Sequence, residues 1–101
     1  MDNGIEMVLD RLNQTEGRFD QWAGLAWPLP ELEAQLVARF ERLMVVALCR
    51  GMTPGQVCRL VGIDAEFLDV IVAERATEPA VIAACAARPE ALAAALGALD
   101  D

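Results

Sequence analysis

Few residues in this chain are suited to catalysis, because its 101 residues include no His, Lys, Ser or Tyr. These absences remove the most frequent general base, the serine nucleophile, the Schiff-base amine and the phenolic acid. Carboxylates, three threonines and three cysteines are left. We therefore expect a protein that is not an enzyme and that uses no cofactor.

The three cysteines, Cys49, Cys58 and Cys85, match no familiar metal or redox motif. Their number is odd, no Cys-x-x-Cys pair occurs, and a tetrahedral zinc site would lack ligands without His. One interpretation is three buried thiols in a reducing cytosol, and the alternative is a redox switch. No metal site is predicted.

Composition indicates a small acidic protein outside the membrane. The chain is 55% hydrophobic and 24% charged, with a net charge of -8, and its length fits one domain. Its start lacks the basic stretch of a targeting signal, and no apolar run approaches the roughly 18 residues of a membrane span. We expect a cytoplasmic protein that does not contact a membrane.

The elements that must position any site are predicted to be helices, because no alternating apolar and polar run argues for a sheet. The expected fold is all-α, with five to six helices. The predicted helices cover residues 3–13, 31–50, 54–61, 65–75, 78–85 and 89–99. Thr77 is the expected cap of the fifth helix, and Gly17 is expected to loosen the chain after the first.

Two segments carry unusual patterns. Trp22, Trp27, Pro28 and Pro30 predict a connector whose rings cover the core, with a binding hook as the alternative. The run LMVVALC at residues 43–49 is apolar on every side, which predicts burial between several neighbours or in a subunit interface.

The strongest local signals surround two short helices. Thr53, Pro54 and Gln56 form a capping-box start, Gly62 ends that helix, and Asp64 caps the next. In the second of these helices, four apolar residues are predicted to share one face: Phe67, Leu68, Ile71 and Val72.

Residues 51–72 resemble the helix-turn-helix of resolvases, sigma factors and terminase small subunits. In those modules a phrase of the type G-M-T/S-P-x-Q-I-A-x-x-L-G-I-S leads into the recognition helix. The matching positions here are Gly51, Met52, Thr53, Pro54, Gln56, Val57, Cys58, Leu60 or Val61, Gly62, Ile63 and Asp64. The resemblance implies a left-handed Gly62 in the turn and a core plugged by Ile63, Leu68 and Ile71. We expect the chain to form a single domain, 1–101. It would consist of an N-terminal helix and connector (1–30), a helix-turn-helix-like core (31–75) and Ala-rich C-terminal helices (76–101).

The recognition helix departs from a DNA-reading pattern. Its outward positions include Asp64, Glu66, Asp69 and Glu74, and no basic residue occurs before Arg75. Carboxylates repel phosphates, and phosphate neutralisation supplies most non-specific DNA affinity. The pattern favours a scaffold that does not read DNA, and docking of these acids on a basic partner is one interpretation. Carboxylates that only keep the protein soluble are the other.

Positive charge gathers in the middle of the chain. Residues 34–63 hold four arginines and one glutamate, whereas both flanking segments are acidic. Arg39, Arg42, Arg50 and Arg59 either pair with the protein's own acids or form a patch that recognises a carboxylate surface or a phosphate.

We therefore expect a small regulatory or adaptor protein that forms a homodimer and binds another protein, with a basic or nucleic-acid-associated protein as one candidate. The expected partner-binding residues are Asp64, Glu66, Asp69, Glu74, Arg39 and Arg42. The alternative is a DNA-binding regulator or packaging-type protein that uses Arg39, Arg42, Arg50 and Arg59.

Overall fold

The chain folds into helices throughout the residues that the computed structural model describes, 4–23 and 30–100. No strand occurs within these ranges, so the all-α prediction is confirmed. The elements in chain order are α1 (Ile5–Ala23), α2 (Pro30–Cys49), α3 (Pro54–Val61), α4 (Ala65–Arg75), α5 (Pro79–Ala86), α6 (Pro89–Gly97) and the 3-10 turn η1 (Ala98–Asp100).

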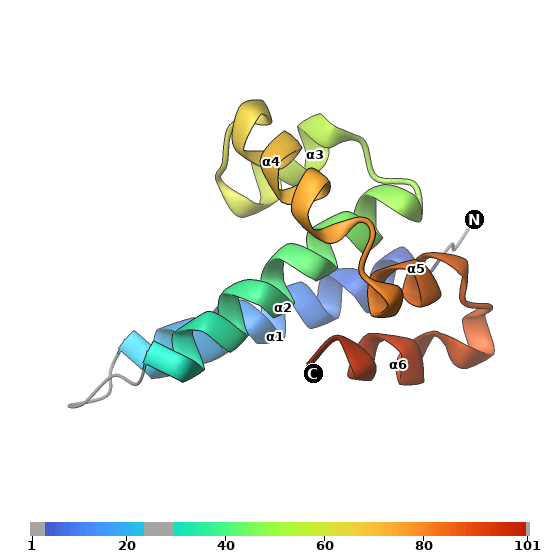
Figure 1. Ribbon diagram of the computed structural model, residues 1–101, viewed down its shortest axis with the longest axis horizontal. Coiled ribbons are helices and arrows are strands. Elements are labelled where there is room, and N and C mark those ends of the chain that lie inside the picture. The colour runs from blue at the N-terminus through green and yellow to red at the C-terminus, as the bar shows by residue number, and fades with distance from the viewer. Residues whose placement is uncertain (1–3, 24–29, 101) are drawn as a thin grey trace.

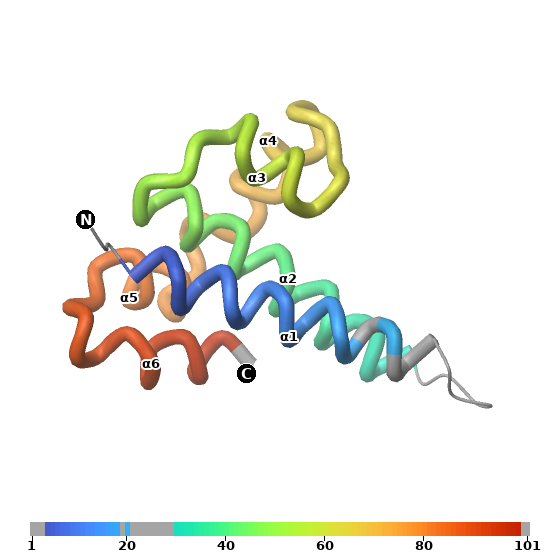
Figure 2. Tube along the Cα trace, turned by 180° about the vertical axis from the view of Figure 1, so that it is seen from behind, coloured from blue at the N-terminus to red at the C-terminus, as the bar shows by residue number. Residues whose placement is uncertain are grey.

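Helix α2 is the central element. It lies side by side with the equally long α1, and the two run in opposite directions (Figures 1 and 2). Helices α3 and α4 sit over the C-terminal half of α2, and α5 and the start of α6 lie near the start of α1 (Figure 1). Helix α6 then runs back so that η1 contacts the middle of α2. Helix α2 contacts α1, α3, α4, α5 and η1. None of the described helices is long and apolar enough to cross a membrane.

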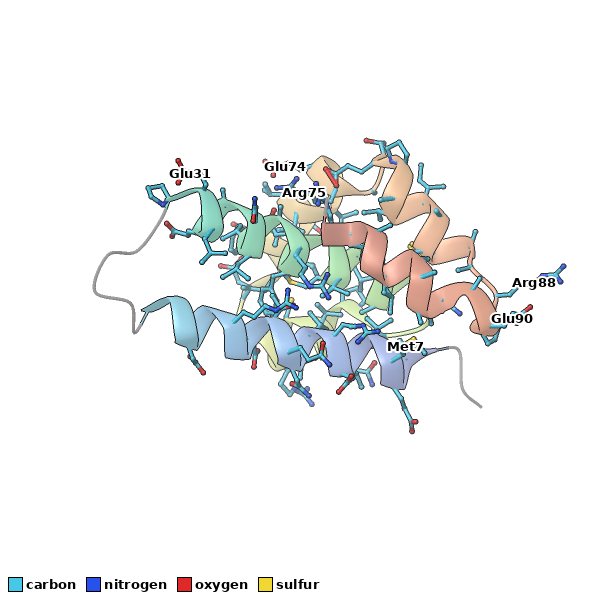
Figure 3. All side chains as sticks on the ribbon, turned by 90° about the horizontal axis from the view of Figure 1, so that it is seen from below. Met7, Glu31, Glu74, Arg75, Arg88 and Glu90 are labelled. Carbon is cyan, nitrogen blue, oxygen red and sulfur yellow. The ribbon has the colours of Figure 1, made fainter. Side chains whose placement is uncertain are left out.

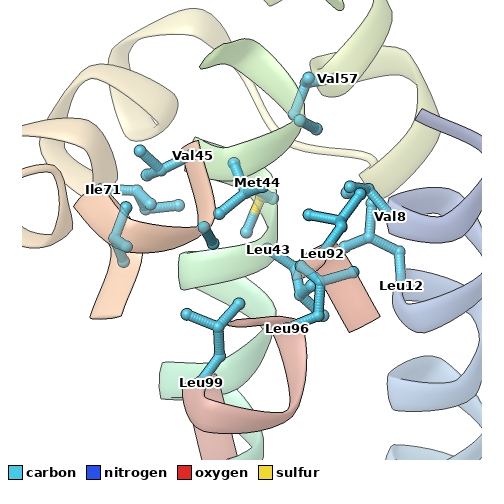
Figure 4. Close-up of a cluster of buried hydrophobic side chains, with 14 of the residues drawn as sticks. Val8, Leu12, Leu43, Met44, Val45, Val57, Ile71, Leu92, Leu96 and Leu99 are labelled. Atoms are coloured by element: carbon cyan, nitrogen blue, oxygen red, sulfur yellow. The ribbon is translucent and has the colours of Figure 1, made fainter. Parts of the chain in front are cut away.

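The hydrophobic core forms around the part of α2 that is apolar on every side. Residues 43–47 are all buried, and leucines and valines from α1, α3, α5, α6 and η1 pack around them (Figure 4). With Leu68 and Ile71 of α4, six neighbouring elements therefore cover residues 43–47 within one chain. Of the two environments predicted for the run 43–49, burial between several neighbours is confirmed for residues 43–47, whereas Leu48 is partly exposed and Cys49 is exposed.

The local signals of the two short helices are confirmed. The Gln56 N–H donates to Thr53 Oγ1 at 3.1 Å, and the Thr53 N–H donates to Gln56 Oε1 at 2.9 Å, which completes the capping box. The Phe67 N–H donates to Asp64 Oδ1 at 2.7 Å. Gly62 ends α3 with φ 76°, a left-handed conformation that glycine adopts without steric cost.

The predicted end of the first helix is wrong. Helix α1 continues from Ile5 to Ala23, straight through Gly17. One glycine costs a helix about 1 kcal/mol, and packing of a long helix against a neighbour exceeds that cost. The buried Thr15, which lies two residues before Gly17, holds this part of α1 against α2.

The predicted cap of the fifth helix is also wrong. Glu78, not Thr77, is the N-cap of α5, and its side chain makes no capping hydrogen bond. Pro79 at the first helical position sets the helix start because its φ is already helical. The Glu78 carboxylate is thereby left to bind arginines.

The tryptophan connector lies mostly outside the described residues. The backbone of Trp22 belongs to the last turn of α1, whereas Trp27 and Pro28 fall outside the described ranges. Pro30 is the first residue of α2. The predicted role of the two rings, as core cover or binding hook, therefore stays a prediction.

Candidate functional site

Helix α4 divides its residues between a buried face and an exposed acidic face. Leu68 and Ile71 are buried, 2% and 1% exposed, and attach α4 to α2 and α3. Three carboxylates that the sequence singled out, Glu66, Asp69 and Glu74, are exposed. At about 100° per residue these three spread over the side opposite the buried pair.

Two large apolar side chains stand exposed among these acids. Phe67 is 48% exposed and Val70 is 51% exposed. The prediction that Phe67 belongs to the buried face is wrong, because Phe67 lies at the edge of the apolar arc in the first turn of α4. Val70 follows Phe67 by three residues, so the two side chains are neighbours on the helix surface. The periodicity of apolar residues in the sequence did not reveal that Phe67 is left exposed by its neighbours.

The only basic residue of α4 points inward. Arg75 Nε lies 3.0 Å from Glu41 Oε1, and Arg75 Nη1 lies 3.0 Å from Glu78 Oε2. Its neighbour Glu74 is exposed (Figure 3). The outward face of α4 therefore carries carboxylates without a cation of its own. We call this surface, made by Glu66, Phe67, Asp69, Val70 and Glu74, the α4 face.

Two arginines predicted to bind a partner are used inside the fold. Arg39 is only 4% exposed, and its Nε donates to Thr15 Oγ1 at 3.2 Å. Arg42 donates from Nε to Glu78 Oε1 at 2.7 Å and from Nη1 to the Leu99 carbonyl at 2.8 Å. Arg42 therefore matches the predicted internal pairing with an acid, whereas Arg39 is held against α1.

The other two arginines differ in their hydrogen bonds and in their exposure. Arg50 Nη1 donates to the carbonyls of Ala84 and Ala87 at 3.2 and 2.9 Å. Arg59 is exposed on α3. The structure thus separates Arg39 and Arg42, which are bonded inside the fold, from Arg50 and Arg59, which line one groove, and does not gather all four arginines into one basic patch.

An open groove of about 740 Å³ lies between the start of α1 and helix α3. Its apolar part comes from Ile5, Leu9, Met52 and Leu60, and its polar part from Arg50, Gln56 and Arg59. This groove does not include the acids of the α4 face. Spacing within one helix could not reveal it, because its two walls are far apart in the sequence.

The cysteines differ in their environments. Cys49 is exposed, whereas Cys58 and Cys85 are partly exposed, so the prediction of three buried thiols is wrong. Cys49 and Cys85 line a second cavity of about 410 Å³, together with Arg50, Gly51 and Ala87. In the described ranges, no three Cys, Asp or Glu side chains lie together in a way that could hold a metal ion.

Comparison of the chain with protein-family models, with curated proteins and with solved structures finds no match. The function proposed below is therefore argued from the residues of this chain alone.

Proposed function

We propose that this chain is a small regulatory or adaptor protein that binds a basic protein partner through the α4 face. The observation that carries the proposal is the exposed apolar pair Phe67 and Val70 between the carboxylates of Glu66, Asp69 and Glu74. Aromatic residues, Phe among them, are enriched at the centres of protein interfaces, and polar residues form the rims. Carboxylates in that rim select a partner with lysines or arginines.

The stability of the domain does not require this face. Exposed charges contribute about 0–1 kcal/mol to folding, and Leu68 and Ile71 already attach the helix to the core. Phe67 and Val70 are adjacent on the helix surface, so they form a small exposed apolar patch, and exposed apolar patches rimmed by polar residues mark contact sites. The carboxylates of the α4 face and the apolar pair Phe67 and Val70 lie on one surface, so a single partner protein could contact both.

We also propose that α3 and α4 are a helix-turn-helix-like scaffold without DNA-reading chemistry. The left-handed Gly62 and the capped starts of both helices support the scaffold. The acids on the outward side of α4 argue against phosphate contact. The alternative DNA-binding function is weakened because Arg39, Arg42 and Arg50 make internal hydrogen bonds. A homodimer and a cytoplasmic location stay predictions.

Charge reversal on the α4 face tests the proposal. The double variant Glu66→Arg with Asp69→Arg should lose partners that the wild-type protein captures from source cells, and Phe67→Ala should weaken the same partners at least tenfold. Glu6→Arg with Asp10→Arg is the matched control, because both residues are exposed on α1 and the change in net charge is equal. This control should keep the partners.

The thermal unfolding of each variant is measured in parallel. The α4 double variant should unfold within a few degrees of the wild type, since its charges are exposed. Equal loss of partners from the α1 control would contradict a specific α4 contact. A micromolar, salt-sensitive shift of random duplex DNA, abolished by Arg59→Ala, would favour the DNA-binding alternative instead.

A further inference from the structure

Two cysteines that are distant in the sequence meet in the fold. Cys49 is the last residue of α2, and Cys85 lies in the last turn of α5, with α3 and α4 between them in the chain. Arg50, the residue after Cys49, donates from Nη1 to the Cys85 carbonyl at 3.4 Å, which joins the ends of α2 and α5 that carry the two cysteines. Both side chains line the cavity of about 410 Å³ described above, so small solutes have access to the pair.

Arg50 holds the backbone around this pair. It follows Cys49 directly, and its Nη1 donates to the carbonyls of Ala84, Cys85 and Ala87 at 3.2, 3.4 and 2.9 Å. Hydrogen bonds from a charged donor are stronger than neutral ones. The residue next to one cysteine therefore binds the peptide groups on either side of the other, which joins the end of α2 to the end of α5.

The two thiols differ in exposure, and burial shifts the pKa of Cys85. Burial raises the pKa of the Cys85 thiol to about 12, the hydrogen bond and charge of Cys49 add to this rise, and the Arg50 guanidinium opposes it. Cys85 therefore keeps its proton and can donate it to the Cys49 sulfur. Cys49 is exposed, so it is the thiol that meets a reagent from solution.

We propose that Cys49 and Cys85 form a dithiol modification site that low-molecular-weight disulfides of the glutathione type oxidise to an intramolecular disulfide. The Cys49 thiolate attacks one sulfur of the reagent, forms a mixed disulfide and expels a first thiolate. Cys85 then loses its proton to solvent and attacks the Cys49 sulfur, which expels the second thiolate. Two protein thiols are oxidised, and one reagent disulfide is reduced to two thiols.

The mixed disulfide prepares the second step. Once the Cys49 sulfur is bonded to the reagent it can no longer become a thiolate, so the contribution of a Cys49 charge to the raised pKa of Cys85 is removed. The Arg50 guanidinium, which lowers that pKa, stays in place. The resulting bond would tie the end of α2 to α5 and close a loop that contains α3 and α4. This inference is independent of the proposed binding function.

Oxidation of the purified protein by a glutathione redox buffer, followed by alkylation and mass spectrometry, tests the site. The wild type should lose about 2 Da, and digestion should give one peptide pair linked through Cys49 and Cys85. Cys58→Ala is the matched control and should behave like the wild type. The oxidised protein should unfold about 10 °C or more above the reduced form, because the bond constrains the unfolded chain.

Single cysteine variants distinguish the role of Cys49, which attacks the reagent, from that of Cys85, which resolves the mixed disulfide. Cys85→Ala should accumulate a glutathione adduct on Cys49, because the resolving thiol is missing, whereas Cys49→Ala should form neither the adduct nor the disulfide. The proposal is overturned if the wild type stops at a stable adduct, if Cys58 is found in the linked peptide, or if no redox ratio links the pair.

Discussion

Arg42 Nε lies 2.7 Å from Oε1 of Glu78, which joins the middle of α2 to the residue that precedes α5. The other Glu78 oxygen accepts from Arg75 Nη1 at 3.0 Å, and Arg75 also pairs with Glu41 at 3.0 Å. Two carboxylates and two guanidinium groups thus link α2, α4 and the start of α5. These pairs are only partly exposed, so solvent screens them less than surface ion pairs.

This network predicts a dependence of stability on pH. The hydrogen bond from Arg42 lowers the pKa of Glu78, burial opposes the shift, and the hydrogen bond from Arg75 adds to the lowering. A carboxyl with a lowered pKa in the folded state stabilises the fold above its unfolded pKa and loses that contribution as pH falls through the folded value. Glu78→Gln should therefore cost about 1–3 kcal/mol at neutral pH.

Urea unfolding of both proteins between neutral pH and about pH 3 measures this effect. The difference in unfolding free energy between wild type and Glu78→Gln should shrink as the carboxyl of Glu78 becomes protonated. Glu90→Gln is the control, because Glu90 is exposed on α6, and it should change little at any pH. A difference independent of pH would show that the ion pairs at Glu78 do not contribute.

Substitution of glycine by alanine should have opposite effects on stability at two positions, Gly17 and Gly62. Gly17 lies inside α1, and an added Cβ would meet no atom within 4 Å, so Gly17→Ala should stabilise the protein by about 0.5–1 kcal/mol. Gly62 also has open space, but its φ of +76° is strained for alanine, so Gly62→Ala should cost about 1–2 kcal/mol. Chemical denaturation of the two variants measures both signs, and destabilisation by Gly17→Ala would contradict a continuous α1.

Arg39 and Arg59 are predicted to differ in what they do for the protein. Arg39 is buried and bonded to Thr15, so Arg39→Ala should cost about 2–4 kcal/mol through lost packing and an unsatisfied neighbour. Arg59 is exposed, so Arg59→Ala should change stability by less than about 0.5 kcal/mol. Thermal unfolding compares the two. An Arg39→Ala variant as stable as the wild type would show that this arginine is available for a partner.

The sequence by itself determined most of the helix boundaries, because their signals are local. The capping box of Thr53 and Gln56, the cap at Asp64 and the left-handed Gly62 each act within a few residues of their own position. Pro54 and Pro89 likewise mark helix starts through their own fixed φ. The spacing of Leu68 and Ile71 also indicated correctly which side of α4 is buried.

Only the tertiary structure decided which side chains meet. Arg42 and Glu78, like Cys49 and Cys85, are brought together by the packing of α2 against the region of α5, and no spacing in the chain records that contact. The exposure of Phe67 was likewise decided by the tertiary structure, because it depends on where the neighbouring helices lie. Helix starts and ends follow from interactions along the backbone, whereas ion pairs, thiol pairs and exposed apolar residues follow from how whole helices pack.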